Sequence, residues 1–416
     1  MIIQLNTNMK TLLTIAAALF LGAQAFATDF PVVYNYDTKN QECFEVHTEV
    51  PDGNYLVTIK IGSKKKAGNT FIKAESRRLY VNDLNTAKGE FQTVQFVVNK
   101  RDAIIRQEGK KDVNVTLKSR ENGKYNWDKY LNIEILGNAP VVESITIEPA
   151  PNATTIFLCG DSTVVDQDNE PWASWGQMFP WFWNTNVAIA NYAESGERTD
   201  TFIGAGRLNK ILSVLKPGDY VFVEFGHNDQ KINNRMGGGA YYFFATQLKT
   251  FIDQVKAKGG HTVLVSPTHR RNFDQNGKIV ESHLDYPEAM EWVAKREGVP
   301  FIDLHKMSAA FYEALGPEKS KTAFVHYKAG DFPGMPADVA DNTHFNHYGA
   351  FELAKCVVGA MQIMGMPIAE NIINFNGYNP STPAPAEDFH WFPSPYRTMA
   401  AQVAEKDDKA TEVPRK

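Results

Sequence analysis

Apolar and polar residues alternate along the first part of the chain. Residues 55–61, 113–117 and 131–135 each place an apolar side chain at every second position. A period of two is typical of a strand with one buried face. Turn-forming sequences separate these runs, as at residues 51–54 (Pro-Asp-Gly-Asn). Short strands with few helical stretches predict a β-sandwich over residues 28–148, which is a candidate carbohydrate-binding domain.

The pattern changes near residue 154, where short apolar runs begin to alternate with helical periodicity. The apolar runs, each predicted to be a buried strand, lie at residues 155–159, 187–192, 220–225, 261–266 and 300–303. The helical patterns lie at residues 201–215, 241–258, 287–297 and 348–364. Strands that are buried on both faces and separated by helices are typical of a mostly parallel sheet. We therefore expect a three-layer α/β domain over residues 149–379.

The two ends of the chain differ from both patterns. Residues 12–21 form an apolar run after a lysine, and residues 25–27 (Ala-Phe-Ala) fit the small-x-small cleavage rule. The run is short for a membrane span, so residues 1–27 predict a cleaved signal peptide and a periplasmic or extracellular protein without membrane insertion. Residues 380–416 are proline-rich and then charged, which predicts a partly disordered extension. Within it, residues 390–392 (His-Trp-Phe) are expected to dock on the domain surface.

Charge and cysteine content narrow the chemistry. The net charge of −5 at pH 7 does not favour nucleic acid as a partner. Three cysteines are present, an odd number that leaves at least one thiol free. Cys159 ends a predicted strand and Cys356 lies in a predicted helix, so both are expected in the core. No Cys-x-x-Cys pair or His/Cys spacing indicates zinc, and no cofactor is expected.

Ser162 is the candidate nucleophile. It lies in the sequence Gly-Asp-Ser-Thr at residues 160–163, directly after a predicted buried strand. Active sites of α/β sheets form at the carboxyl ends of the strands. A serine there needs an adjacent base, and backbone N–H groups at the start of a following helix are expected to face a developing oxyanion. The alternative is a simple helix cap, because Asp, Ser and Thr favour that position.

Two further strand ends offer oxyanion donors. Asn228, in the sequence Gly-His-Asn-Asp at residues 226–229, carries a neutral amide that can stabilise charge formed only in the transition state. Gly196 offers a backbone N–H that a substrate can approach closely. The alternative for both residues is an ordinary role in a turn.

Asp341 and His344 are the candidate base pair. With the two residues three positions apart on a tight loop, the carboxylate can hold imidazole Nδ1 while Nε2 accepts the serine proton. His347 begins the last predicted helix and is expected to cap or pack. A metal site at His344 and His347 is an alternative, but it lacks a third ligand at a characteristic spacing.

These segments, in this order, resemble the four blocks of the SGNH hydrolases, which are named for Ser, Gly, Asn and His. Closer matches to the rhamnogalacturonan acetylesterase branch lie at residues 160–164, 175–178, 191–193, 216–221 and 225–229. The resemblance spans roughly residues 155–364 and does not cover the first domain.

The resemblance implies a flavodoxin-like sheet of five parallel strands flanked by helices. It implies that Ser162 is the nucleophile, His344 the base and Asp341 the residue that orients the base. The N–H groups of Ser162 and Gly196 and the amide of Asn228 then form the oxyanion hole. The implied reaction removes acetyl groups from an acetylated polysaccharide or oligosaccharide, such as the backbone of pectin, through an acetyl-serine and without a metal.

Substrate recognition is less defined. Where the family pattern has a second glycine, this chain has Glu197, an acid near the expected site of a polyanion. Arg270 and Arg271 follow a predicted strand and are candidates for pairing with galacturonate carboxylates, the alternative being a charged loop. The tryptophans at near-helical spacing are expected mostly in the core, with one exposed for sugar stacking. They are Trp172, Trp175, Trp181 and Trp183.

Two alternatives to a carbohydrate acetylesterase stay open. One is another SGNH activity: a lipase, an acyl-xylan esterase or an acetyltransferase. The other is a carbohydrate-binding protein in which the hydrolase domain is inactive. The separate α/β-hydrolase fold is disfavoured, because the chain has no Gly-x-Ser-x-Gly sequence.

Overall fold

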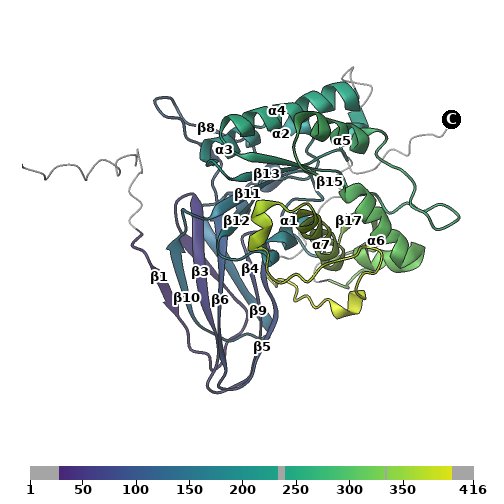
Figure 1. Ribbon diagram of the computed structural model, residues 1–416. Helices are drawn as coiled ribbons and strands as arrows, with labels where there is room; N and C mark the ends of the chain where they lie inside the picture. Colours follow the sequence, from purple (N-terminus) through teal and green to yellow (C-terminus); the bar gives the residue numbers. More distant parts are fainter. Residues whose placement is uncertain (1–27, 233–238, 333–334, 396–416) are drawn as a thin grey trace, which may run out of the picture.

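Two parts with different architectures make up the chain (Figure 1). The computed structural model describes residues 28–232, 239–332 and 335–395. The predicted signal peptide and the end of the C-terminal extension lie outside these residues. No helix in the described part is long and apolar enough to cross a membrane.

The first part is a β-sandwich of two antiparallel sheets. One sheet has the order β1-β10-β3-β6 and the other β2-β9-β4-β5. Their strands are β1 (Val32–Asn35), β2 (Phe44–Glu49), β3 (Gly53–Gly62), β4 (Gly68–Ala74), β5 (Arg78–Thr86), β6 (Phe91–Lys100), β9 (Tyr130–Ala139) and β10 (Val142–Pro149). Val57, Ile59, Ile133 and Ile135 are fully buried between the sheets. The period-two pattern therefore predicted the correct buried faces.

One predicted strand of this part is largely absent. Of residues 113–117, only β8 (Val113–Asn114) pairs, with β7 (Ile104–Ile105), and Val113 is exposed. The next residues leave the sandwich, and the N–H of Thr116 donates to the carbonyl of Ala205 at 2.8 Å. The alternation at 113–117 therefore comes from a segment that crosses to the α/β part. The short helices η1 (Ser119–Glu121) and η2 (Tyr125–Trp127) follow it.

The second part contains five parallel strands in the order β12-β11-β13-β14-β15, as expected. They are β11 (Thr154–Cys159), β12 (Val187–Asn191), β13 (Tyr220–Glu224), β14 (His261–Val265) and β15 (Phe301–Ile302). The sheet is also continuous with the sandwich, because Ile189 of β12 pairs with Val98 of β6. One nine-stranded sheet thus runs through both parts.

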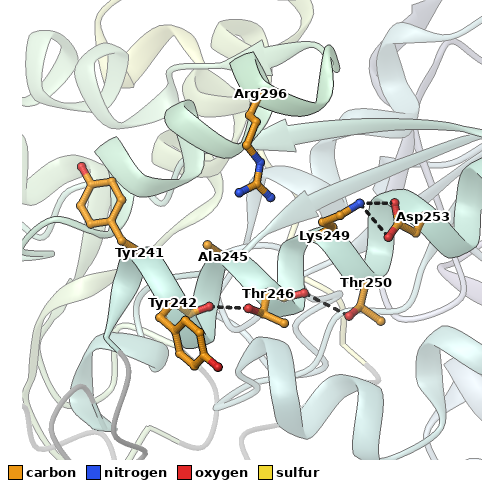
Figure 2. A pocket seen from close by; sticks show the side chains of 8 residues that line it. All are labelled: Tyr241, Tyr242, Ala245, Thr246, Lys249, Thr250, Asp253 and Arg296. Carbon is orange, nitrogen blue, oxygen red and sulfur yellow. Dashed lines mark hydrogen bonds and ion pairs between the residues drawn. The ribbon is translucent and has the colours of Figure 1, made fainter.

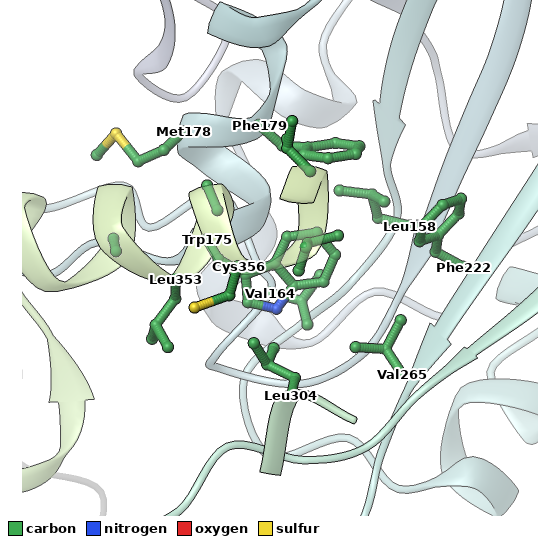
Figure 3. Close-up of a cluster of buried hydrophobic side chains, with 14 of the residues drawn as sticks. Leu158, Val164, Trp175, Met178, Phe179, Phe222, Val265, Leu304, Leu353 and Cys356 are labelled. Atoms are coloured by element: carbon green, nitrogen blue, oxygen red, sulfur yellow. The ribbon is translucent and has the colours of Figure 1, made fainter. Parts of the chain in front are cut away.

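Helices cover both faces of the parallel strands. One face packs against α1 (Trp175–Met178), α6 (Leu304–Lys319) and α7 (His347–Ile363). The other packs against α2 (Thr199–Gly204), α3 (Arg207–Val214), α4 (Ala245–Ala257) and α5 (Tyr286–Glu297). Figure 3 shows the first core, where Trp175, Phe179 and Cys356 meet strand residues such as Leu158. The predicted core location of Trp175, Trp183, Cys159 and Cys356 is correct, and Trp172 and Trp181 are partly exposed.

The helical patterns differ from the structure in three places. The predicted helix 201–215 is divided between α2 and α3 at Gly206, whose φ of +80° is left-handed. The predicted helix 241–258 begins as a π-helical turn, η5 (Ala240–Phe244). Helix α6 was not predicted. The remaining short elements are η3 (Phe179–Phe182), η4 (Asp229–Ile232), η6 (Ser320–Ala323), β16 (Phe324–Tyr327), β17 (Val339–Phe345), η7 (Pro367–Asn371) and η8 (Ala386–Asp388).

The described part of the C-terminal extension joins the two parts of the molecule. The ring of Trp391 stacks on His347 with centroids 4.1 Å apart. The carbonyl of Phe392 accepts a hydrogen bond from Lys73 of the sandwich at 2.8 Å. The expected docking of residues 390–392 therefore occurs at the junction, where the yellow C-terminal segment runs in Figure 1.

Candidate active site

The strand order brings three candidate residues to one edge of the sheet. β11 lies between β12 and β13. The connection from β11 to β12 therefore runs one way along the sheet, and the connection from β12 to β13 runs back the other way. Such a switch point leaves a crevice at the carboxyl ends of the strands. Ser162 follows β11, Gly196 follows β12 and Asn228 follows β13. The parallel sheet thus places these three loops next to one another.

Ser162, His344 and Asp341 form a hydrogen-bonded series. Ser162 Oγ lies 2.8 Å from His344 Nε2. His344 Nδ1 lies 2.7 Å from Asp341 Oδ2. Ser162 and His344 are buried, at 6% and 7% exposure, and the Asp341 side chain is 23% exposed. Because a carboxylate oxygen only accepts, Nδ1 carries the proton and Nε2 faces the hydroxyl with its lone pair.

Asp341 and His344 lie in strand β17 rather than in a free loop. Phe345 pairs with Phe324, whereas Ala340 pairs with His326, so the register shifts and the residues between form a bulge. Within the bulge, Asp341 Oδ1 accepts the N–H groups of Thr343 and His344 at 2.8 and 2.9 Å. This local turn brings residues three positions apart to the same side.

The same hydrogen bonds control the charge of Asp341. Burial acts to raise the pKa of this carboxyl, but the charge of His344 and the hydrogen bonds from its ring, its N–H and the N–H of Thr343 outweigh burial and lower the pKa to about 2. Asp341 is therefore ionised at neutral pH and can stabilise a protonated imidazole.

Ser162 lies in a single turn, and no helix starts there. The N–H groups of Val164 and Val165 both bond to the carbonyl of Asp161, at 3.1 and 3.0 Å, and the next helix begins at Trp175. The expected helix start after the nucleophile is therefore wrong. Gln167 Nε2 also donates to the Ser162 carbonyl at 2.9 Å, which helps to hold the turn without a helix.

Sequence reasoning missed a buried acid below this turn. Glu224, at the end of β13, lies 2.9 Å from Thr163 Oγ1, and Thr163 Oγ1 lies 3.0 Å from Asp161 Oδ1. Burial, and then the charge of Asp161, raise the pKa of Glu224 to about 8. A protonated Glu224 avoids a second buried charge and supports the Ser162 turn from the neighbouring strand.

The candidate oxyanion donors are held by links between two loops. Asn228 Nδ2 donates to the carbonyl of Glu197 at 3.0 Å, and Lys231 Nζ donates to Asn228 Oδ1 at 2.9 Å. These two contacts orient the Asn228 amide. The second hydrogen on Nδ2 remains available to donate to a substrate oxygen. Asp229 Oδ1 also accepts the N–H of Thr199 at 2.9 Å. Gly196 adopts a left-handed φ of +74° in the first of these loops and is exposed.

Two cations from the segment that leaves the sandwich after β8 reach the Gly196 loop. Lys118 Nζ lies 3.0 Å from Glu197 Oε1 and donates to the carbonyl of Ser195 at 2.5 Å. Arg120 Nε pairs with Glu194 Oε1 at 2.6 Å, and its Nη2 also donates to the Ser195 carbonyl. The acidic residues near Gly196 are therefore charge-balanced from the other part of the molecule, which the sequence did not indicate.

Arg270 and Arg271 make protein contacts through their guanidinium groups. Arg270 donates to the carbonyls of Ser282 and His227, both at 3.1 Å. Arg271 donates to Asn342 Oδ1 at 2.8 Å, beside the β17 bulge, and to the carbonyl of Pro317. Both residues are buried, at 8% and 9% exposure. This arrangement favours a role in fixing the loops, and substrate contact by either arginine stays a prediction.

His344 and His347 do not share a site. His347 begins α7, as expected, and its Nε2 pairs with Glu170. A separate group that could hold a metal ion is present in the described residues, and sequence spacing did not show it. It consists of His269, Glu281, His283 and His305.

A surface pocket lies over α4 and the end of α5. It is lined by Tyr241, Tyr242, Ala245, Thr246, Lys249, Thr250, Asp253 and Arg296. Figure 2 shows these side chains around an open depression, with Lys249 paired to Asp253. None of the candidate catalytic residues lines it.

Comparisons with known proteins show what this chain is similar to. The model of the GDSL-like Lipase/Acylhydrolase family matches residues 158–350. The chain is 40% identical over 224 residues to rhamnogalacturonan acetylesterase RhgT of Bacillus subtilis (strain 168), covering 53% of this chain and 95% of RhgT. It is 34% identical over 223 residues to the probable rhamnogalacturonan acetylesterase YesY of the same organism, covering 53% of this chain and 98% of YesY. It also resembles a crystal structure of the B. subtilis protein YxiM, with a TM-score of 0.47 and 25% identity over 81% of this chain and 84% of YxiM.

Proposed function

Since the chain belongs to the GDSL-like lipase/acylhydrolase family and is a carboxylic ester hydrolase, we propose that it removes acetyl groups from the rhamnogalacturonan of pectin through an acetyl-serine intermediate. The observation that carries the proposed mechanism is the series from Ser162 Oγ through the His344 ring to Asp341, with contacts of 2.8 and 2.7 Å. A serine hydroxyl needs such a base to act as a nucleophile at neutral pH.

In the first half of the proposed reaction, Ser162 Oγ attacks the carbonyl carbon of the acetyl ester. Its proton passes to His344 Nε2, and Asp341 stabilises the imidazolium that forms. The negative charge on the carbonyl oxygen is met by the Asn228 amide and by the N–H groups of Ser162 and Gly196. Losing one such donor typically costs ~3 kcal/mol of transition-state stabilisation.

The tetrahedral intermediate then collapses to the acetyl-serine, which water hydrolyses in the second half of the reaction. The bond to the sugar oxygen breaks, the imidazolium returns its proton to that oxygen, and the deacetylated sugar leaves. In the second half, His344 takes a proton from water as the water oxygen attacks the acetyl-serine. Collapse of this second intermediate releases acetate, and the proton on His344 returns to Ser162 Oγ.

The substrate assignment is supported by the relatives and by local charge. RhgT and YesY carry rhamnogalacturonan acetylesterase in their names. The contact of Glu197 with Lys118 balances the acid that would otherwise face a polyanionic chain. Lys118 and Arg120 keep 32% and 24% of their side chains exposed, so the rim of the site carries partly exposed cations.

Acetate release from acetylated rhamnogalacturonan, acetylated xylan and acetylated mannan tests this assignment. We expect the highest kcat/KM on rhamnogalacturonan. A higher value on xylan would place the activity on another glycan, and a preference for long-chain esters would make the protein a lipase. Binding to the polysaccharide without any turnover would support the carbohydrate-binding alternative.

We also propose that the protein is secreted and that residues 1–27 are its signal peptide. The support is the apolar run followed by the sequence Ala-Phe-Ala. The intact mass of the protein recovered from the periplasm or medium tests this. We expect the mature chain to begin near Thr28, whereas a chain that retains Met1 or Met9 would contradict it.

A further inference from the structure

We propose that this protein binds one Zn²⁺ ion between His269, Glu281, His283 and His305. One ligand atom of each residue lies within 4.8 Å of the other three. The three histidines are buried, and half of the Glu281 side chain is exposed, which gives an ion a route from solvent. Imidazole nitrogen and carboxylate oxygen are donors that Zn²⁺ prefers, and four of them complete a tetrahedral site.

The His305 ring shows that a positive charge belongs in this cluster. Its Nδ1 lies 2.8 Å from the carbonyl of Pro267. A proline carbonyl only accepts, so Nδ1 carries a proton and Nε2 has a lone pair. That Nε2 lies 2.7 Å from Glu281 Oε2, another acceptor. Two acceptors at this distance need a cation between them, which is either a proton or a metal ion.

His269 favours the metal ion over the proton. Its Nε2 lies 3.9 Å from the same Glu281 oxygen, and its ring stacks on His305 with centroids 3.5 Å apart. Its Nδ1 is buried and has no hydrogen-bond partner among the described residues. A proton on His305 satisfies Glu281 but gives the His269 imidazole no partner, whereas a metal ion would bind both rings.

The distances also suit a zinc site. Zn–N and Zn–O bonds of about 2.0–2.1 Å place neighbouring ligand atoms of a tetrahedron roughly 3.3–3.4 Å apart. The contacts of 2.7 and 3.9 Å from the two rings to Glu281 Oε2 lie on either side of that value. To bind one ion together, the stacked rings of His269 and His305, with centroids 3.5 Å apart, must separate to about 5 Å, because tetrahedral bonds hold two imidazoles at that spacing.

Outer hydrogen bonds orient two of the proposed ligands, Glu281 and His305, as they do in metal sites. The backbone N–H of His283 donates to Glu281 Oε1 at 2.5 Å, which leaves Oε2 for the cluster. The Pro267 carbonyl fixes the His305 ring in the same way. Ligating histidines almost always make such a second hydrogen bond, and it sets the tautomer that can bind metal.

The site joins three segments and lies next to the oxyanion loop. His269 follows β14, Glu281 and His283 precede α5, and His305 is in the first turn of α6. His283 Nε2 lies 2.9 Å from His227 Nδ1, and His227 is the chain neighbour of Asn228. A bound ion would therefore hold these loops together and restrain the loop of Asn228, without contacting the reacting atoms.

Zinc binding can be measured without reference to esterase activity. The full chain, purified without a histidine tag and stripped with a chelator, is titrated with Zn²⁺ alone by calorimetry. We expect one ion per chain with a micromolar or lower Kd, and saturating Zn²⁺ should raise Tm by about 5 °C. His269→Gln and Glu281→Gln should each weaken binding at least tenfold. The matched control His261→Gln, at the exposed opposite end of β14, should bind as the wild type does.

Two outcomes would overturn the proposal. The first is a wild-type chain that takes up no Zn²⁺, which would mean that the pair of His305 and Glu281 holds only a proton. The second is equal affinity in the wild type and in both ligand variants, which would place the ion elsewhere. If His269→Gln does not fold, the wild-type stoichiometry and the affinity of Glu281→Gln, a change at a half-exposed position, still decide the question.

Discussion

Lys118 Nζ lies 3.0 Å from Glu197 Oε1, which links the segment between β8 and β9 to the loop that carries Gly196. The Glu197 side chain is buried, and Thr201 Oγ1 donates to its other oxygen at 2.5 Å. The carbonyl of the same Glu197 accepts from the Asn228 amide. One residue therefore connects a cation of the first part of the molecule to a candidate oxyanion donor of the second.

Removing the Lys118 charge should weaken catalysis without touching the triad. In Lys118→Met, the buried Glu197 carboxylate loses its cation, and we expect the loop to shift enough to lower kcat on a chromogenic acetate ester roughly tenfold, about 1.4 kcal/mol. Lys64→Met, at an exposed position of the same part, is the matched control and should keep full activity. An unchanged kcat in Lys118→Met would show that the segment between β8 and β9 does not support the site.

Arg271 allows a loop-fixing role to be separated from a substrate role. Its contacts with Asn342, Ser320 and Pro317 fix the strand that carries Asp341. We expect Arg271→Lys to lower kcat by a similar factor on a small acetate ester and on an acetylated polysaccharide, because a lysine cannot reproduce the forked contacts. A rise in KM restricted to the polysaccharide would instead support the predicted substrate contact.

Asp341 should matter for orientation and charge rather than for proton transfer. Because its pKa is lowered to about 2, the carboxylate stays ionised across the acid range in which esterases are assayed. Asp341→Asn should lower kcat by about 10⁴, since an amide can stabilise the wrong tautomer of His344. In the wild type, activity should fall on acidification because a protonated His344 cannot accept the serine proton. An acid-independent rate would remove the histidine from that role.

The raised pKa of Glu224 predicts that the free energy of unfolding depends on pH. Its pKa is raised to about 8 in the folded chain, against about 4.3 in an unfolded chain. Between these values the unfolded chain releases the proton and the folded chain keeps it, so this group reduces the free energy of unfolding as pH rises from about 4 to 8. Glu224→Gln should therefore gain stability relative to the wild type over that range in denaturant unfolding. A constant difference between the two proteins would contradict a protonated Glu224, and the exposed Glu108→Gln serves as the control.

Local pattern was sufficient for the five parallel strands, for most of the sandwich strands and for the order of the candidate catalytic segments, but not for α6. A strand with one buried face has apolar residues at every second position, and a strand with two buried faces is apolar throughout. The five parallel strands were therefore predicted nearly to their ends. Ser162, Gly196 and Asn228 could be proposed together because parallel strands end at the same sheet edge.

Contacts between distant segments were outside the reach of the pattern. Nothing in the periodicity showed that β12 pairs with β6, that Lys118 reaches Glu197, or that Glu224 contacts Thr163, the chain neighbour of Ser162. The bulge in β17 was missed because an Asx-type turn within a strand has the same sequence signal as a loop. Metal-ligand spacing failed for a similar reason: His269 and His305 come from different segments and meet only in the fold.

The account rests on Ser162 as the nucleophile, and one measurement tests it most directly: the rate of acetate release from a chromogenic ester by the wild type and by Ser162→Ala. We expect the variant to keep the wild-type circular dichroism spectrum and to lose several orders of magnitude in kcat, as deletions within a triad do. A folded Ser162→Ala that hydrolyses the ester at close to the wild-type rate would contradict it.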